Sequence, residues 1–207
     1  MYRWEITRAA LAQRIVAVVR ADSYDEAAAT ADTLLSAGLT TLEISLTTPF
    51  ALEVVTTMAR EVGDDAVIGA GTVLDAASAR MAIDAGARYL AAPHLDAETV
   101  ATAHRYGVPV FPGAATAGEI VRALELGADA IAVFPASAVT PDWLRDVRAA
   151  LPQAPLIPTC GVTDRTAPQW LAAGAVACAM GAELTDGDRD TVLKRVADLL
   201  TRLPEAV

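Results

Sequence analysis

The chain has 207 residues, of which 54% are hydrophobic and 20% are charged, and this balance excludes a disordered protein and favours one domain with a large core. Sixteen basic residues against 26 acidic residues give a net charge of −10, so nucleic-acid and membrane partners are disfavoured by repulsion. Fifteen of the basic residues are arginine and one, Lys194, is lysine. Any chemistry that needs a lysine amine therefore depends on Lys194.

Cysteine usage and the apolar pattern indicate a reduced, cytoplasmic protein. The two cysteines, Cys160 and Cys178, form no CxxC pair, which excludes a disulfide-rich scaffold and a four-cysteine zinc site. The N-terminal segment MYRWEITRAALAQR is too charged for a signal peptide. No uninterrupted apolar run reaches the roughly 18 residues that a membrane-spanning helix needs.

Short β-branched runs alternate with longer Ala/Leu/Glu/Arg stretches along the whole chain. A short helix is expected around Ile6–Gln13. The predicted strands are Ile15–Arg20, Thr41–Leu46, Val67–Thr72, Tyr89–Ala92, Val108–Pro112, Ala130–Phe134, Leu156–Thr159 and Ala175–Met180. The predicted helices between and after them are Tyr24–Ala37, Pro49–Val62, Ala76–Ala85, Ala97–Tyr106, Ala117–Leu126, Pro141–Ala150, Arg165–Ala173 and Arg189–Arg202.

This alternation predicts an α/β fold, a (β/α)8 TIM barrel with a short N-terminal helix, as a single domain over residues 1–207. The strands are apolar at nearly every position, which is typical of a parallel sheet covered on both faces. A doubly wound open sheet is the rival architecture, but it usually has a glycine-rich turn after its first strand. Here that strand ends in VVRADS, without glycine.

In such barrels the reactive groups follow the carboxyl ends of the strands. Glu43 stands out because it interrupts the apolar run LTTLEISL, and alternation places it opposite Leu42 and Ile44, on the inner face. A buried carboxylate is costly unless it is paired or protonated. Glu43 is therefore interpreted as a general acid/base with a raised pKa, or alternatively as a structural partner of Arg20.

Arg20 ends the first strand, where its guanidinium suits a substrate carboxylate or an ion pair with a nearby acid. His94 sits on a rim loop, as an acid/base group or as a solvated side chain. A metal site built from Glu43, His94 and Cys160 has no supporting ligand spacing, so neither a metal nor another cofactor is expected. Cys160 as a nucleophile has no visible base.

Eight blocks of the sequence resemble the bacterial 2-keto-3-deoxy-6-phosphogluconate / 4-hydroxy-2-oxoglutarate (KDPG/KHG) aldolases in content and spacing. They are RIVAVVRADS, GLTTLEISLTTP, VIGAGTVLD, AAPHLD, VPVFPGAATAGE, AVFPAS, LIPTCGV and MGAEL. The resemblance runs nearly end to end. It implies a (β/α)8 barrel, a homotrimer and a class I aldolase that cleaves 2-oxo acids to pyruvate and an aldehyde.

The resemblance also implies roles for single residues. The proton-shuttling glutamate falls on Glu43, the carboxylate-binding threonine on Thr72, the fourth-strand proline on Pro93 and the stacking aromatic on Phe134. Many family members carry an arginine at the position of Thr47. Where threonine stands there, as in this chain, we expect Arg20 to hold the substrate carboxylate.

The sixth-strand motif departs from the family. The family reads Lys-Phe/Leu-Phe-Pro-Ala, in which the lysine forms a Schiff base, whereas this chain has Ala132 in the place of that lysine. No neighbouring residue supplies an amine, so a covalent imine is not expected at this position.

The phosphate end departs as well. The family's Thr-Gly-Gly is Thr159-Cys160-Gly161, its serine after Gly181 is Ala182, and Glu183 adds negative charge nearby. Thr159 and Gly161 are thus retained as binding positions, and an unphosphorylated small carboxylate is the expected ligand.

Three interpretations remain open. The first is an enzyme that acts on a 2-oxo acid through Glu43, without a Schiff base. The second is a catalytically inactive homologue that serves as a trimeric binding or scaffold protein. The third is an active aldolase whose lysine was replaced at Ala132 in the laboratory, although the scarcity of lysine elsewhere argues against a single change.

Overall fold

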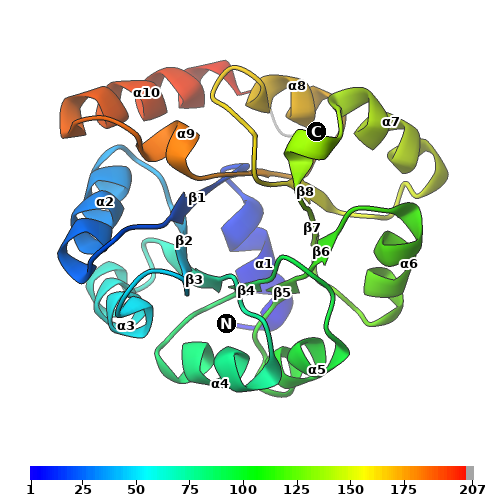
Figure 1. The fold of residues 1–207 in the computed structure, drawn as a ribbon, viewed down its shortest axis with the longest axis horizontal. Helices are drawn as coiled ribbons and strands as arrows, with labels where there is room; N and C mark the ends of the chain where they lie inside the picture. The colour runs from blue at the N-terminus through cyan, green and yellow to red at the C-terminus, as the bar shows by residue number, and fades with distance from the viewer. Residues whose placement is uncertain (204–207) are drawn as a thin grey trace.

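The computed structural model describes residues 1–203, in which helices surround a curled set of parallel strands (Figure 1). The α-helices are α1 (Arg3–Leu11), α2 (Tyr24–Ser36), α3 (Ala51–Val62), α4 (Ala76–Asp84), α5 (Ala97–Arg105), α6 (Ala117–Glu125), α7 (Pro141–Ala150), α8 (Ala167–Ala172), α9 (Ala182–Thr185) and α10 (Arg189–Arg202). The strands are β1 (Ile15–Val19), β2 (Thr41–Ser45), β3 (Val67–Gly71), β4 (Leu90–Ala91), β5 (Val110–Phe111), β6 (Gly113–Ala114), β7 (Ile131–Val133), β8 (Leu156–Pro158) and β9 (Cys178–Met180).

The strands form two parallel sheets, one in the order β5-β4-β3-β2-β1-β9 and one in the order β6-β7-β8. Backbone hydrogen bonds connect their margins: Asp129 N–H donates to the carbonyl of Val110 at 3.2 Å, and Val176 N–H donates to the carbonyl of Leu156 at 3.0 Å. The strands curl around a common centre, and α2 to α8 and α10 lie outside them (Figure 1). The curled parallel α/β fold is as predicted, and division into eight closed strands stays a prediction.

Several predicted boundaries were wrong for identifiable reasons. The strand expected over residues 108–112 is shortened to β5 (Val110–Phe111). A separate strand, β6 (Gly113–Ala114), follows Pro112, which has no N–H for the ladder. The third helix begins at Ala51, since Phe50 has a left-handed φ of 58°. The first helix begins at Arg3 instead of Ile6. The Glu5 carboxylate accepts a 2.6 Å hydrogen bond from Tyr2 N–H and so caps the first turn.

Other boundaries shift inwards or add short elements. The last strand begins at Cys178 and the eighth helix at Ala167, both later than predicted. The sequence did not predict α9 or the 3₁₀ turn Ala136–Ala138. Both follow directly on strand ends, where short segments carry too few residues for a periodic pattern.

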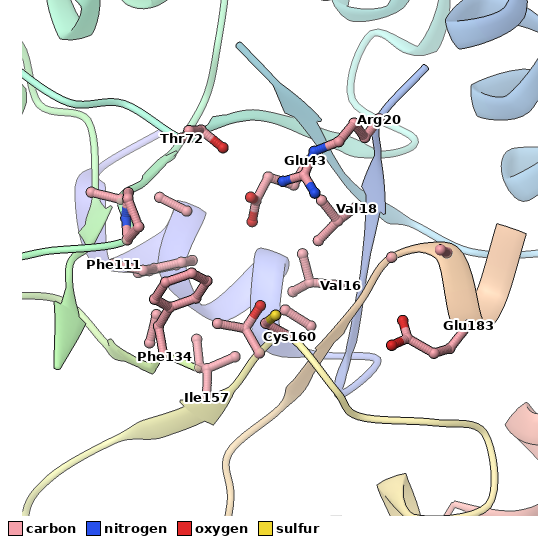
Figure 2. Close-up of a pocket in the computed structure, with 18 residues that line it drawn as sticks. Val16, Val18, Arg20, Glu43, Thr72, Phe111, Phe134, Ile157, Cys160 and Glu183 are labelled. Carbon is pink, nitrogen blue, oxygen red and sulfur yellow. The ribbon is translucent and has the colours of Figure 1, made fainter. Parts of the chain in front are cut away.

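Side chains on successive strand residues point alternately outwards and inwards. Outward aliphatic residues, such as Leu42, Ile44 and Ile131, pack under the helices in one large cluster. Inward residues form a second cluster, to which α1 contributes Ile6 and Ala10. This alternation follows the two-residue period of a strand and turns Glu43 towards the centre (Figure 2).

The amino-terminal ends of the strands are covered by α1, which lies across the centre of the ring in Figure 1. Arg3 Nε lies 3.0 Å from Asp129 Oδ1, and His104 Nε2 lies 3.0 Å from Asp129 Oδ2. The second carboxylate oxygen also accepts a 3.0 Å hydrogen bond from Val110 N–H. This end of the strands is therefore covered by α1, and both carboxylate oxygens of Asp129 have partners there.

Candidate active site

A cavity of about 290 Å³ opens at the carboxyl ends of the strands (Figure 2). It lies where catalytic groups of parallel α/β barrels are found. The residues that line it are Val16, Val18, Arg20, Glu43, Thr72, Ala91, Ala92, Pro93, Phe111, Ala132, Phe134, Ile157, Thr159, Cys160, Ala179, Gly181, Ala182 and Glu183. Every strand region of the fold except β6 thus contributes to one hollow.

Glu43 lies in the middle of β2 and extends into this cavity (Figure 2). The carboxylate occupies space beside Gly71 of the neighbouring strand, where a Cβ atom would overlap it. Burial raises the pKa of Glu43 to about 7, and the positive charge of Arg20 offsets part of that rise. At neutral pH this carboxyl is accordingly divided between its protonated and ionised forms, as acid/base work requires.

Tyr89 lies fully buried close to Glu43, a neighbour that the sequence analysis did not identify. Its hydroxyl donates a 3.1 Å hydrogen bond to the carbonyl of Leu42, and its ring fills the space left by the missing side chain of Gly69. Burial raises the pKa of Tyr89, and the nearby charge of Glu43 raises it further. Gly69 and Gly71 of β3 therefore leave room for Tyr89 and Glu43, respectively.

Hydroxyl groups connect Arg20 to Thr72 across β2. Arg20 Nε donates to Thr47 Oγ1 at 3.2 Å, Thr47 Oγ1 lies 2.8 Å from Ser45 Oγ, and Ser45 Oγ lies 2.9 Å from Thr72 Oγ1. Ser45 is fully buried, so this chain of hydrogen bonds has a fixed centre. It holds the guanidinium side of the cavity in a defined geometry.

The structure brings most of the predicted site residues together. Arg20, Glu43, Thr72, Pro93, Phe134 and Thr159 all line the cavity, as does Ala132. Thr47 and Gly161 lie outside the lining set. Thr47 contacts Arg20 instead, and Gly161, with a φ of 99°, packs where a Cβ would lie 2.8 Å from Ser137.

Three other groups considered from the sequence lie apart from the cavity centre. His94 is exposed and does not line the cavity. Lys194 is exposed on α10, in the outer ring of helices. Cys178 is buried on the outward face of β9, where burial raises the pKa of its thiol to about 12. Cys160, by contrast, does line the cavity, with a left-handed φ of 65°.

The apolar floor is the part of the cavity that sequence reasoning missed. We use this name for Val16, Phe111, Ala132, Ile157 and Ala179, which lie on inward strand positions and are 2 to 6% exposed. The alternation of each strand contained the signal, but strands that are apolar on both faces hide it.

Within residues 1–203, no group of three or more His, Cys, Asp and Glu side chains is arranged to hold a metal ion. The helices of the same segment include none with both the length and the apolar character to cross a bilayer.

A parallel α/β fold with a buried carboxyl, Glu43, in a pocket at the carboxyl ends of its strands defines a class of small-molecule binding proteins and enzymes. Within that class, the family model "KDPG and KHG aldolase" matches residues 6–199. The chain therefore belongs to the KDPG and KHG aldolase family, whose relatives are carbon–carbon lyases.

Individual relatives agree with this assignment. The chain is 34% identical over 171 residues to the 2-dehydro-3-deoxy-6-phosphogalactonate aldolase of Escherichia coli K12, covering 82% of this chain and 83% of the relative. It is 31% identical over 184 residues to the 2-dehydro-3-deoxy-phosphogluconate aldolase of Zymomonas mobilis ZM4, covering 88% of each.

Solved structures agree as well. The 2-keto-3-deoxy-6-phospho-gluconate aldolase of Zymomonas mobilis ATCC 29191 superimposes with a TM-score of 0.87 at 26% identity, over 100% of both chains. A native KDPGal structure gives a TM-score of 0.85 at 31% identity, covering 91% of this chain and 93% of the other.

Proposed function

We propose that the protein acts on a small, unphosphorylated 2-oxo acid or related carboxylate through acid–base chemistry at Glu43, without a Schiff base. The observation that carries the proposal is the pairing of two facts in one cavity. Glu43 extends into it with a pKa of about 7, and Ala132 supplies only a methyl group on its floor. The chain's single lysine lies on the outer helix α10.

In this proposal Arg20 and Thr72 hold the substrate carboxylate near Glu43. The ionised Glu43 takes a proton from the carbon next to the ketone and becomes a carboxylic acid, while the electron pair of the broken C–H bond moves into the enolate. The Arg20 guanidinium stabilises the negative charge on that enolate. Return of the proton from the Glu43 carboxylic acid to the same carbon restores the ionised Glu43 and completes a cycle in which protons and charge balance.

The remaining predicted residues shape this site. Pro93, Phe134 and Thr159 line its walls, and Thr47 orients Arg20 through its 3.2 Å hydrogen bond. Gly161 permits the close turn beside Ser137. Ala182, Cys160 and Glu183 stand where an anionic tail would approach, and a carboxylate there disfavours phosphate. This supports an unphosphorylated ligand.

We test the proposal by proton exchange. In D₂O, the C3 protons of pyruvate exchange with solvent only if a base removes them, and ¹H NMR follows their loss. We expect the protein to accelerate this exchange and Glu43→Gln to slow it by about 10² to 10⁴-fold. Glu61→Gln, a matched change at an exposed residue of α3, leaves the rate unchanged. A Glu43→Gln protein that exchanges at the original rate contradicts the assignment.

A non-catalytic relative is the second candidate, and Ala132 with the weakened phosphate end favours it. Such a protein binds a carboxylate without turning it over. Saturable binding of pyruvate by calorimetry, with no exchange above the solvent rate for any 2-oxo acid tried, identifies it.

Self-association and barrel closure belong to the same proposal. We propose a cytoplasmic homotrimer of closed (β/α)8 barrels. One solved neighbour, at 31% identity and a TM-score of 0.85, is a cage designed by fusing symmetric oligomeric domains, which supports an oligomer. Native mass spectrometry that gives three times the 21.5 kDa chain mass fits the proposal, and a monomer contradicts it.

A further inference from the structure

The floor of the cavity offers a ligand no hydrogen-bonding side chain. Val16, Phe111 and Ile157 present hydrocarbon, and Ala132 and Ala179 present methyl groups. Val16, Phe111, Ile157 and Ala179 belong to the inner core cluster, which also includes Tyr89 and Val67. Figure 2 shows Val16, Phe111 and Ile157 gathered below Glu43. A polar group placed against this floor would lose its water without gaining a partner.

The charges of the cavity are distributed unevenly around its mouth. Arg20 is the one cationic side chain in the lining, and it lies at the end of β1 (Figure 2). Glu43 faces it, and Glu183 lies on α9, across the cavity from Phe111 and Thr72 (Figure 2). Within residues 1–203, no ion pair neutralises Glu183. One anionic group of a ligand has a partner here, and a second anionic group meets a carboxylate.

We propose that the ligand is a monoanionic 2-oxo acid with a compact, branched aliphatic side chain, whose carboxylate binds Arg20 and whose side chain packs on the apolar floor. This inference rests on the proposed function for the 2-oxo group and adds the class of the side chain. A volume of about 290 Å³ lies at the lower limit of ligand pockets, so the group on the floor is small. Ala132 completes the floor, because its methyl group leaves room for the ligand's side chain, whereas a longer polar side chain would fill that space.

The test is a calorimetric titration of the intact protein with four named 2-oxo acids. Pyruvate, 2-oxobutanoate and 3-methyl-2-oxobutanoate differ by one carbon each, and 2-oxoglutarate adds a second carboxylate. We expect the dissociation constant to fall about fourfold for each added carbon, or about 15-fold across the series. We expect 2-oxoglutarate to bind at least about tenfold more weakly than 3-methyl-2-oxobutanoate.

Two variants locate the effect on the floor. Val16→Thr is nearly isosteric and places a hydroxyl there, and Ala132→Ser does the same with a smaller change in volume. Each should reduce the ratio of the dissociation constants of pyruvate and 3-methyl-2-oxobutanoate to less than about threefold. Val121→Thr, the same change at an exposed residue of α6, preserves the full difference in affinity of about 15-fold. Thermal unfolding of each variant confirms that it is folded. If one floor variant does not fold, the other is sufficient for the test.

The results separate this inference from the proposed function, because binding is measured without turnover. Equal affinity along the series, tighter binding of 2-oxoglutarate, or no binding of any of the four overturns the ligand class. Affinity that rises with each added carbon, together with unchanged proton exchange in Glu43→Gln, leaves the ligand class standing and removes the catalytic role of Glu43. The opposite pair of results removes the ligand class and keeps Glu43.

Discussion

The two ends of the strand ring are built from the same strands but treat charge in opposite ways. At the amino-terminal end, Asp129 is paired with Arg3 and His104 under α1. At the carboxyl end, Glu43 extends into a cavity, and burial holds its pKa at about 7. Paired charges stabilise the fold, whereas a desolvated carboxyl costs stability and gains reactivity. The closed end is therefore expected to govern stability, and the open end to govern chemistry.

The largest expected effect concerns the pH dependence of the stability that the buried Glu43 carboxylate costs. The pKa of Glu43 is raised from 4.5 to about 7, so the folded protein binds the proton more tightly than the unfolded chain. The free energy of unfolding therefore falls as pH rises from 4.5 to 7 and levels off above pH 7. Glu43→Gln removes this loss and should gain about 3 kcal/mol over the original protein across that range.

Urea unfolding at pH 4.5, 6 and 8 measures the difference. Glu61→Gln is the control, since its exposed side chain should show no comparable trend. A difference between Glu43→Gln and the original protein that stays constant with pH would show that Glu43 is not desolvated.

The next effect sharpens the geometry of the open end. A methyl group at Gly71 would overlap the carboxylate of Glu43 and must displace it. We expect Gly71→Ala to slow the exchange of pyruvate C3 protons by about 10²-fold, because small displacements of a reacting group are costly. Gly118→Ala on α6 is the matched control, since its methyl group meets no atom within 4 Å. Equal exchange rates in the two variants refute the placement of Glu43.

A smaller effect is expected from removing the Asp129 carboxylate at the closed end. Asp129→Ala leaves Arg3, His104 and the N–H of Val110 without their partner, and Asp129 is only 9% exposed. We expect the free energy of unfolding to fall by about 2 kcal/mol, with proton exchange at the site unchanged. Asp64→Ala breaks the pair with Arg88 at a side chain that is 92% exposed, and should cost under about 1 kcal/mol. Comparable losses in the two variants would contradict the contrast between buried and exposed pairs.

The smallest effect concerns Ser45. Its hydroxyl connects Thr47 to Thr72, so Ser45→Ala interrupts the hydrogen bonds that hold Arg20. We expect pyruvate to bind about fivefold more weakly, which corresponds to about 1 kcal/mol. Ser36→Ala on α2, an exposed residue, serves as the control. Unchanged affinity for pyruvate in Ser45→Ala would show that Arg20 keeps its position without these hydroxyls.

Sequence patterns were sufficient for the features that depend on local alternation. The inward direction of Glu43 followed from the aliphatic residues on either side of it, and the clustering of Arg20, Thr72 and Phe134 followed from their positions at strand ends. Contacts between distant segments were not available in this way. Tyr89 reaches Leu42 only because Gly69 of β3 leaves room, which requires three strands in register.

Backbone conformation set the other limit. The left-handed φ of Phe50 delays the start of α3, and Pro112 separates β5 from β6, although neither residue interrupts the apolar pattern. The apolar floor was hidden for a related reason. Its members are aliphatic or aromatic residues in strands whose outward positions are equally apolar, so composition does not tell the two faces apart.

The central claim is that chemistry at the open end proceeds without an amine. Incubation with pyruvate and sodium borohydride, followed by intact-mass spectrometry, tests it directly, because borohydride reduces an imine to a permanent adduct. We expect no mass increase for the protein itself and an increase of one reduced pyruvate for Ala132→Lys, whose new amine enters the cavity. An adduct on the unaltered chain would contradict the account.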